Sequence, residues 1–394
     1  MRRTTVLWEA FVTRFEDAWD RHKKGRLTAE EAGELLGMSA RHFRRLRARY
    51  EDSGVDGLRD RRLGRVSGRR APESELERMR RLYREEYADF TVKHFHEELR
   101  QRHNYTLGYT VTRLALQSAG LVTKAKRRGQ HRKKRPRRPL PGMLLFQDGS
   151  THRWIGALDH DLDLVVMVDD ATGAIYSAIL VAQEGTMSSF LGLQETIAAQ
   201  GLFGALYTDR GSHYFFTPKA GGKVDKRQPT QVGQALARLG IRHIPSYSPE
   251  GRGRMERLFG TLQQRLPPEL RHGGISTVAA ANQYLRESFV PAYNARFAKP
   301  AAEPGSAFVA YAGPPLADVL CMQADRQVGR DNCVLWARQS LQIPPQLHRH
   351  HYVKATVRVH EYPYGRLAIF DGPRCLGRYD QDGRPAENPV PRAA

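Results

Sequence analysis

Apolar side chains recur every three or four positions along the first 122 residues, which is the spacing of one face of a helix. The opening helix carries four aromatic residues on one face: Trp8, Phe11, Phe15 and Trp19. Thr28 and Glu31 form a capping box at the start of a second helix, and Ser39 caps a third after a turn at Gly37. Two helices joined by so short a turn predict a helix-turn-helix unit within residues 1–58.

A second helical unit is predicted at residues 71–122. Its apolar positions again follow helical spacing: Leu76, Met79 and Tyr83, then Val92, Phe95 and Leu99, then Val111 and Leu114. The polar face of this unit carries fewer basic residues than that of the first. We interpret it as a second DNA-binding domain of three helices.

From residue 143 the pattern changes to short apolar runs that are typical of strands. Strands are predicted at 143–149, 164–170, 174–181, 202–209 and 241–244, and helices at about 187–200, 231–239 and from 253 onward. A turn signal at 170–173 makes the first three strands an antiparallel meander. This order of strands and helices is that of a ribonuclease-H-like α/β core with a mixed sheet, which we place at residues 143–270.

Two further regions are predicted after this core. Val278, Ala281, Leu285 and Phe289 mark a helical extension at 271–300. After a linker rich in proline and alanine, short alternating strands predict a small β-barrel at 316–382. The expected fold class is therefore multidomain: an all-α helix-turn-helix N-terminal region, an α/β core and a small β-barrel C-terminal domain.

The charge of the chain narrows the class of its partners. Lysine and arginine number 63 against 42 acidic residues, a net charge of +21. Such a field attracts polyanions, so nucleic acid is the favoured partner and an anionic membrane surface the alternative. No apolar run is long enough to span a membrane, and the first residues lack the pattern of a signal peptide. Three well-separated cysteines predict neither a zinc site nor a disulfide framework.

Basic residues gather in two places where DNA binding is expected. The second helix of the helix-turn-helix unit carries a basic face suited to a major groove: Arg41, Arg44, Arg45 and Arg47. The linker at 123–142 holds a run without acids, including Lys126, Arg127, Arg128, Lys133 and Lys134. On a DNA backbone this run would become ordered as counterions are released. The alternatives are a helical hairpin with a solvated face and a linker that only adds solubility.

Three carboxylates are the candidate catalytic residues. Asp148 and Asp209 close the first and fourth predicted strands, which are neighbours in such a sheet, and Glu256 follows the fifth strand on a helix. Carboxylates that converge without a lysine repel one another unless divalent cations neutralise them, and oxygen ligands suit Mg²⁺ or Mn²⁺. Two ions roughly 4 Å apart hold the attacking and leaving oxygens of a phosphodiester in line. Asp148 is expected to bridge both ions, with Asp209 and Glu256 completing one site each.

The assignment of Glu256 has two rivals. Arg252, Arg254 and Arg257 surround it, so the group is also typical of a salt-bridged helix surface. In the catalytic interpretation, these arginines bind DNA phosphates. Glu250 is the other candidate for the third carboxylate. We prefer Glu256 because Glu250 is predicted to lie in a loop, which holds a ligand less firmly than a helix.

The segments QDGS at 147–150, TDRGSHY at 208–214 and YSPEGRGRMER at 247–257 resemble the three signature motifs of DDE transposases of the retroviral-integrase superfamily. The resemblance is greatest to insertion-sequence transposases of the ISNCY type. The step from Asp209 to Glu256 is longer than the superfamily usually shows, and the zinc-binding HHCC unit of retroviral integrases is absent from the N-terminal region.

The resemblance implies an enzyme, a DDE-type polynucleotidyl transferase that uses two Mg²⁺ or Mn²⁺ ions. It implies cleavage of double-stranded DNA at the terminal inverted repeats of a transposon, followed by attack of the freed 3′-hydroxyl on target DNA. It also implies a homo-oligomer assembled on DNA, in the cytoplasm of a bacterium and associated with the nucleoid. Two alternatives stay open: a catalytically silent helix-turn-helix regulator derived from a transposase, and a nuclease that cuts without joining.

Overall fold

The computed structural model describes residues 2–60, 70–124, 136–219, 222–225, 227–247 and 249–386. The chain divides into two compact units, one up to Glu75 and one from Leu76 onward. The finer division into six regions stays a prediction. No helix in the described part of the chain is long and apolar enough to cross a membrane.

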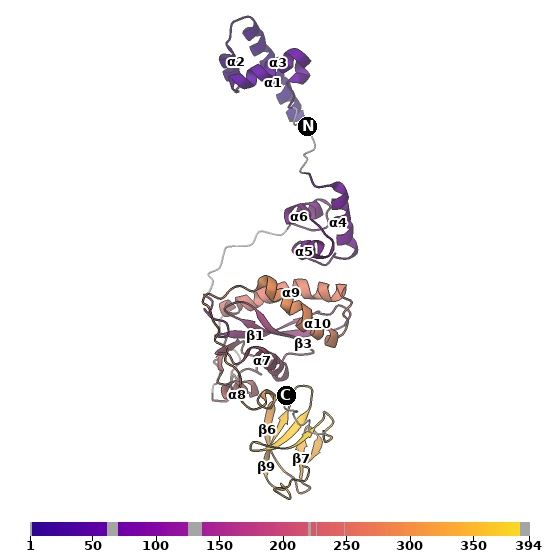
Figure 1. Cartoon of the computed structure of the whole chain (residues 1–394), viewed down its shortest axis with the longest axis vertical. Helices are drawn as coiled ribbons and strands as arrows, with labels where there is room; N and C mark the ends of the chain where they lie inside the picture. The colour runs from indigo at the N-terminus through magenta and orange to yellow at the C-terminus, as the bar shows by residue number, and fades with distance from the viewer. Residues whose placement is uncertain are drawn as a thin grey trace. The chain divides into compact units, whose positions relative to one another are not determined.

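The first unit contains the predicted helix-turn-helix. Its helices are α1 (Arg2–Lys23), α2 (Ala29–Leu35) and α3 (Ala40–Gly57), which pack around Phe15, Phe43 and Leu46 (Figure 1). The capping box is confirmed: the backbone N–H of Thr28 donates to Glu31 Oε2 at 2.7 Å, and the Glu31 N–H donates to Thr28 Oγ1 at 3.2 Å. Gly37 supplies the turn with a φ of +66°.

The three helices that follow are α4 (Glu73–Glu85), α5 (Val92–Arg102) and α6 (Tyr109–Ser118). Met79, Phe95 and Leu99 lie in their core as predicted. The predicted inner face of α6 is wrong, because Leu114 is 54% exposed and the buried positions are Thr112, Ala115 and Leu116. The face that α6 buries is thus shifted by one residue from the face that carries Val111 and Leu114.

The central sheet confirms the predicted mixed topology. Its strands are β1 (Leu145–His152), β2 (Leu162–Asp169), β3 (Ile175–Val181), β4 (Ala205–Thr208) and β5 (Arg242–Pro245). The order across the sheet is β3-β2-β1-β4-β5. The first three strands pair antiparallel, and β1, β4 and β5 pair parallel. The fourth strand is therefore the direct neighbour of the first, as predicted for a ribonuclease-H-like core.

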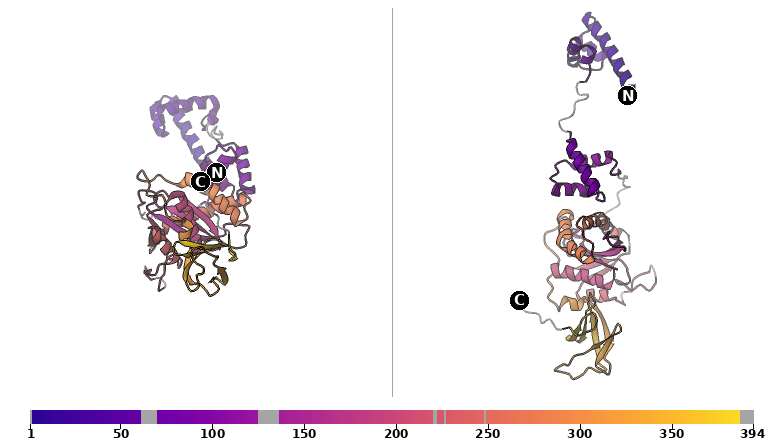
Figure 2. Two further views of the ribbon diagram at one scale, coloured as in Figure 1. Left: turned by 60° about the horizontal axis from the view of Figure 1, so that its bottom comes forward. Right: turned by 90° about the vertical axis from the view of Figure 1, so that its right-hand side faces the viewer.

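Helices cover both faces of this sheet (Figures 1 and 2). On one face lie α9 (Pro249–His272), α10 (Val278–Tyr284), the π-helical turn η1 (Leu285–Phe289) and α11 (Val290–Phe297). On the other lie α7 (Thr186–Gln200) and α8 (Gln231–Arg238). Side chains alternate along β1, so Phe146 joins the core under α9 while Leu145 joins the core under α7. This alternation decides which face receives each polar residue that follows.

The C-terminal strands do not form the predicted barrel. After α12 (Leu316–Val319) come β6 (Met322–Gln327), β7 (Cys333–Trp336), β8 (Gln339–Gln342), β9 (Thr356–Glu361), β10 (Leu367–Asp371) and β11 (Arg374–Tyr379). Four of them form a sheet in the order β11-β10-β9-β6, while β7 and β8 pair only with each other. Val334, Val357 and Ile369 fill a core common to both sheets. The sheets close on each other by apolar packing, not by a continuous hydrogen-bonded ladder.

Candidate functional site

The register of β1 against β4, continued past its last paired residues, brings Asp148 level with Asp209. Leu145 pairs with Leu206, and Phe146 pairs with Tyr207. Asp148 lies three residues after Leu145 along the chain, and Asp209 lies three residues after Leu206. Asp148 is 8% exposed and lies inside β1, whose pairing with β2 continues to His152. The prediction that β1 ends at this acid is therefore wrong, whereas the predicted pairing of the first strand with the fourth is confirmed.

Backbone amides fix one oxygen of each carboxylate. The Gly149 N–H donates to Asp148 Oδ1 at 3.2 Å, and the Gly211 N–H donates to Asp209 Oδ1 at 2.8 Å. The second bond turns the chain sharply after β4. Burial raises the pKa of the Tyr214 phenol well above its usual value, and the charges of Glu184, Asp148 and Asp209 raise it further. Tyr214 therefore stays protonated beside the acids, as a hydrogen-bond donor.

Helix α9 lies over the side of β1 that carries Asp148. Gln263 Nε2 donates to Ser150 Oγ at 3.1 Å. Ser150 and Asp148 are two apart on the strand and so share a side, and Gln263 and Glu256 are seven apart on the helix and share a face. Glu256 itself is exposed. No three His, Cys, Asp or Glu side chains within the described ranges are grouped closely enough to hold a metal ion.

Glu250 does not lie in a loop. Helix α9 begins at Pro249, a favoured residue for the first helical position, so Glu250 and Glu256 are on the same helix. The reason given above for preferring Glu256 is wrong. What favours Glu256 instead is its place on the stripe that Gln263 anchors to β1. Glu256 forms no ion pair with a described side chain, so the salt-bridge interpretation gains no support.

Two residues next to the aspartates were not assigned from the sequence. Glu184 lies in the short connection between β3 and α7, and its Oε1 is 3.6 Å from His213 Nε2 and 3.5 Å from the Tyr214 hydroxyl. His213 lies four residues after Asp209 in the TDRGSHY segment, so the sequence alone already puts it near that acid. No sequence motif indicates Glu184, because only the tertiary fold brings the end of β3 to the loop after β4.

Of the basic residues predicted to bind DNA on α3, three are exposed: Arg41, Arg44 and Arg45. Arg44 pairs with Glu30 at 2.7 Å. Arg47 was expected to point outward, but it is half-buried and contacts His22 Nε2 at 3.0 Å. The residues from Lys126 to Lys134 lie outside the described ranges.

The arginines of α9 differ from one another. Arg254 pairs with Asp170, whose side chain is fully buried, and this counts against the prediction that Arg254 binds DNA. Arg257 is exposed, and its Nε donates to the Gly253 carbonyl within the helix at 2.9 Å. The side chain of Arg252 lies outside the described residues.

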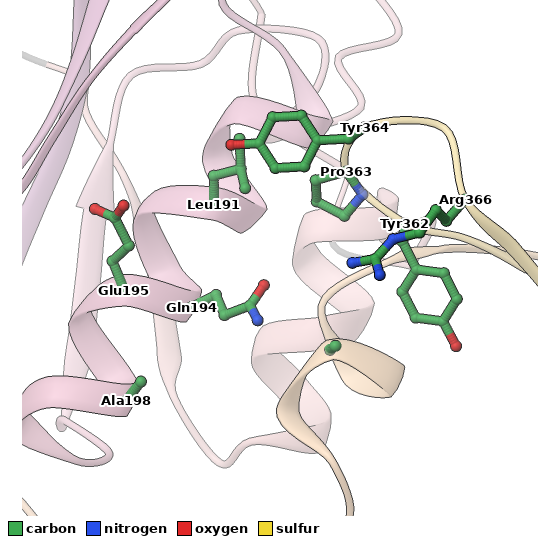
Figure 3. Close-up of a pocket in the computed structure, with 9 residues that line it drawn as sticks. Leu191, Gln194, Glu195, Ala198, Tyr362, Pro363, Tyr364 and Arg366 are labelled. Atoms are coloured by element: carbon green, nitrogen blue, oxygen red, sulfur yellow. The ribbon is translucent and has the colours of Figure 1, made fainter. Parts of the chain in front are cut away.

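A cavity of about 340 Å³ lies elsewhere, between α7 and the loop before β10 (Figure 3). It is lined by Leu191, Gln194, Glu195 and Ala198 of α7, by Ala317, and by Tyr362, Pro363, Tyr364 and Arg366 of the loop. None of the three predicted catalytic residues lines it, and it opens beside the face of the sheet opposite α9. The cavity is therefore separate from the paired aspartates.

Comparison with known proteins finds relatives over most of the chain. The putative transposase y4bF of Sinorhizobium fredii is 32% identical over 347 residues, which are 88% of this chain and 75% of the relative. The transposase for insertion sequence IS1202 of Streptococcus pneumoniae is 28% identical over 309 residues, 70% of this chain and 66% of the relative. A family described as helix-turn-helix domain matches residues 20–66.

Solved structures give weaker matches. The HTLV-2 integrase catalytic core domain in complex with magnesium, in its dimeric form, is 19% identical with a TM-score of 0.28, and the match covers 36% of this chain and 83% of the integrase chain. A chain of the simian T-cell lymphotropic virus intasome in complex with the PP2A regulatory subunit B56 gamma is 17% identical, covering 79% and 99% of the two chains with a TM-score of 0.34.

Proposed function

This chain belongs to the transposase family, and from that premise we propose that it cleaves DNA at transposon ends and joins the freed 3′-hydroxyl to target DNA. The observation that supports this chemistry is the pairing of β1 with β4, whose register, if continued, brings Asp148 level with Asp209 on the sheet that α9, the helix of Glu256, covers. In this proposal the enzyme is a DDE-type polynucleotidyl transferase whose catalytic residues are Asp148, Asp209 and Glu256.

The residues present fit a pair of divalent cations in their chemistry. Asp148 and Asp209 offer carboxylate oxygens, the donor type preferred by Mg²⁺ and Mn²⁺, at neighbouring positions held by backbone amides. Glu256 would supply the third carboxylate from α9. When bound, such ions activate the attacking oxygen and stabilise the leaving oxygen of a phosphodiester. The chain's own part is to hold the carboxylates in register and to orient the DNA end.

The same proposal assigns the remaining regions. The helix-turn-helix unit would recognise the terminal inverted repeats through α3, and the basic run from Lys126 to Lys134 would follow the phosphate backbone. Arg252 and Arg257 are the candidates for phosphate contact near Glu256. Assembly of a homo-oligomer on two ends, and a place on the bacterial nucleoid, belong to the proposal as well.

The test uses the full chain, a duplex carrying the inverted repeat that flanks the gene, and a plasmid target in Mg²⁺. Asp148→Asn and Asp209→Asn should each lower cleavage and joining by roughly a thousandfold, because each removes a charged ligand, with end binding unchanged. Asp159→Asn is the control, since its side chain is fully exposed. Joining of pre-cleaved ends by Asp148→Asn at the wild-type rate would overturn the site.

The identity of the third carboxylate needs its own pair of variants. Glu256→Gln should be as inactive as Asp148→Asn, whereas Glu250→Gln should stay active. The opposite result would give the role to Glu250. Both changes leave end binding intact because the DNA-reading helix α3 is untouched.

A silent DNA-binding regulator is the second candidate. The observation that favours it is the exposed Glu256, which is not grouped with the two aspartates among the described residues. The same assay separates the two functions. A regulator would bind the inverted repeat but neither cleave nor join it in Mg²⁺ or Mn²⁺.

A further inference from the structure

Glu184 is held in place by its backbone. Its N–H donates to Asp163 Oδ2 at 2.6 Å, and the other oxygen of Asp163 accepts a hydrogen bond from Thr151 Oγ1 at 2.5 Å. The next residue, Gly185, donates its N–H to Ser188 Oγ at the start of α7. The position of the Glu184 backbone is thus set by β1, β2 and α7 together.

The carboxylate of Glu184 packs against the α7 face of β1 at Gly149, the residue that follows Asp148. Glu184 Oε2 occupies the place that a Cβ atom on residue 149 would take. The backbone of Gly149 has no positive φ, so its conformation would accept any residue. An alanine in the position next to Asp148 would therefore have to displace the Glu184 carboxylate.

The same carboxylate faces the loop that carries Asp209. Its Oε1 is 3.6 Å from His213 Nε2 and 3.5 Å from the hydroxyl of Tyr214, whose ring is buried. That loop is a tight turn, because the Tyr214 N–H donates to the Gly211 carbonyl at 2.9 Å and Asp209 accepts from Gly211. Displacement of His213 and Tyr214 would consequently shift Asp209.

We propose that Glu184 is a positioning residue of the strand-transfer reaction, which sets the Asp209 loop at a defined distance from Asp148. This inference rests on the proposed function of the two aspartates. A simple surface ion pair with His213 does not account for the contacts with Gly149 and Tyr214. Glu184 thus contacts both the β1 residue that follows Asp148 and the loop that follows Asp209.

The test is a double-mutant cycle of Glu184→Ala and Gly149→Ala. The methyl group at residue 149 meets only the far end of a flexible side chain, so it displaces the Glu184 carboxylate without disturbing the fold. Loss of groups that orient metal ligands typically lowers metal affinity or activity by roughly 10–100-fold. Each single variant should show a loss in that range, and the double variant should be no worse than Glu184→Ala within about twofold.

Mn²⁺ binding, followed by electron paramagnetic resonance of the full chain, provides a readout that does not depend on turnover. The concentration that half-saturates the site should rise roughly tenfold in both single variants, while end binding and thermal midpoint stay unchanged. Glu195→Ala is the matched control. It removes a glutamate of α7 that bonds Ser177 and Arg286 away from the aspartates, and it should leave Mn²⁺ binding as in the wild type.

Three outcomes decide the inference. Wild-type joining and Mn²⁺ binding by Gly149→Ala would overturn it, and so would losses that add in the double variant, since the alanine would then act on Asp148 directly. Non-additive losses support it. Failure of the proposed function would look different, because Asp148→Asn would then join DNA like the wild type, whereas failure of the Glu184 role leaves Asp148→Asn inactive.

Discussion

Helices α3 and α9 are both rich in arginine, but they use it differently. On α3, Arg41 and Arg45 are exposed and form no ion pair with a described side chain. On α9, three arginines pair with acids from distant parts of the second unit. The pairs are Arg254 with Asp170, Arg265 with Glu97, and Arg271 with Asp89.

The difference shows that charge alone does not assign an arginine to DNA. Arg265 and Glu97 are about one-tenth exposed, and Arg296 also contacts Glu97. A guanidinium already desolvated against a carboxylate would have to break that pair before it met a phosphate. We infer that arginines help to hold α9 in place, whereas Arg41 and Arg45 of α3 are left exposed to a partner.

The largest effect that tests this difference between α3 and α9 is expected from a change at Glu97. Glu97→Gln leaves Arg265 buried against a neutral amide, and breaking one side of a buried pair costs about 3 kcal/mol in unfolding free energy. The measurement is chemical denaturation of the full chain followed by circular dichroism. Glu30→Gln is the matched control, since its pair with Arg44 has the same 2.7–2.8 Å separation but is more than half exposed. That control should change stability by less than about 0.5 kcal/mol. Equal effects of the two variants would contradict the proposed difference between the helices.

The second largest effect is expected at Arg254. Arg254→Ala removes the charged partner of a fully buried carboxylate and leaves Asp170 with donors such as the Arg138 N–H at 2.7 Å. Loss of a hydrogen bond to a charged group costs about 2 kcal/mol. The salt dependence of DNA binding should not change. If the variant showed a weaker salt dependence of DNA binding and an unchanged unfolding free energy, Arg254 would be a DNA-binding residue after all.

These pairs also mark where sequence reasoning stops. The capping box at Thr28 follows from a local pattern, the strand order of the core follows from likeness to a ribonuclease-H-like fold, and both are confirmed. Arg254 and Asp170 are 84 positions apart, and Arg265 and Glu97 are 168 apart, so no local pattern could join them. The same limit explains Glu184, which meets the aspartates only after the sheet is assembled.

Two other errors have local causes. Glycines between Glu250 and Arg254 favoured a loop, but Pro249 presets the first helical φ and the buried stripe from Met255 onward stabilises the helix. The barrel was predicted from strand alternation, which identifies strands and says nothing of which edges pair. In the structure β7 and β8 pair only with each other.

The third prediction concerns α3. Arg41→Ala combined with Arg45→Ala should weaken binding to the inverted repeat by about tenfold and reduce the slope of log affinity against log salt by about 1.8, if both contact phosphates. Unfolding free energy should stay within about 0.5 kcal/mol of the wild type, because both side chains are exposed. Fluorescence anisotropy at several salt concentrations provides the measurement. An unchanged slope would mean that this face of α3 is only solvated.

The smallest effect is expected at Arg257, which lies on the same helix as Arg254, three residues further along. Its side chain is exposed and its Nε donates only to the Gly253 carbonyl, so Arg257→Ala should leave stability within about 0.5 kcal/mol. Because the guanidinium has no acidic partner among the described residues, one phosphate contact would account for about 0.9 of the salt slope and about threefold in affinity. The comparison with Arg254→Ala is internal to one helix, so helix propensity largely cancels. The contrary result is that Arg257→Ala lowers the unfolding free energy and leaves the salt slope of DNA binding unchanged. In that case the presence or absence of an acidic partner would not predict what an arginine does, and the contrast between α3 and α9 would be contradicted.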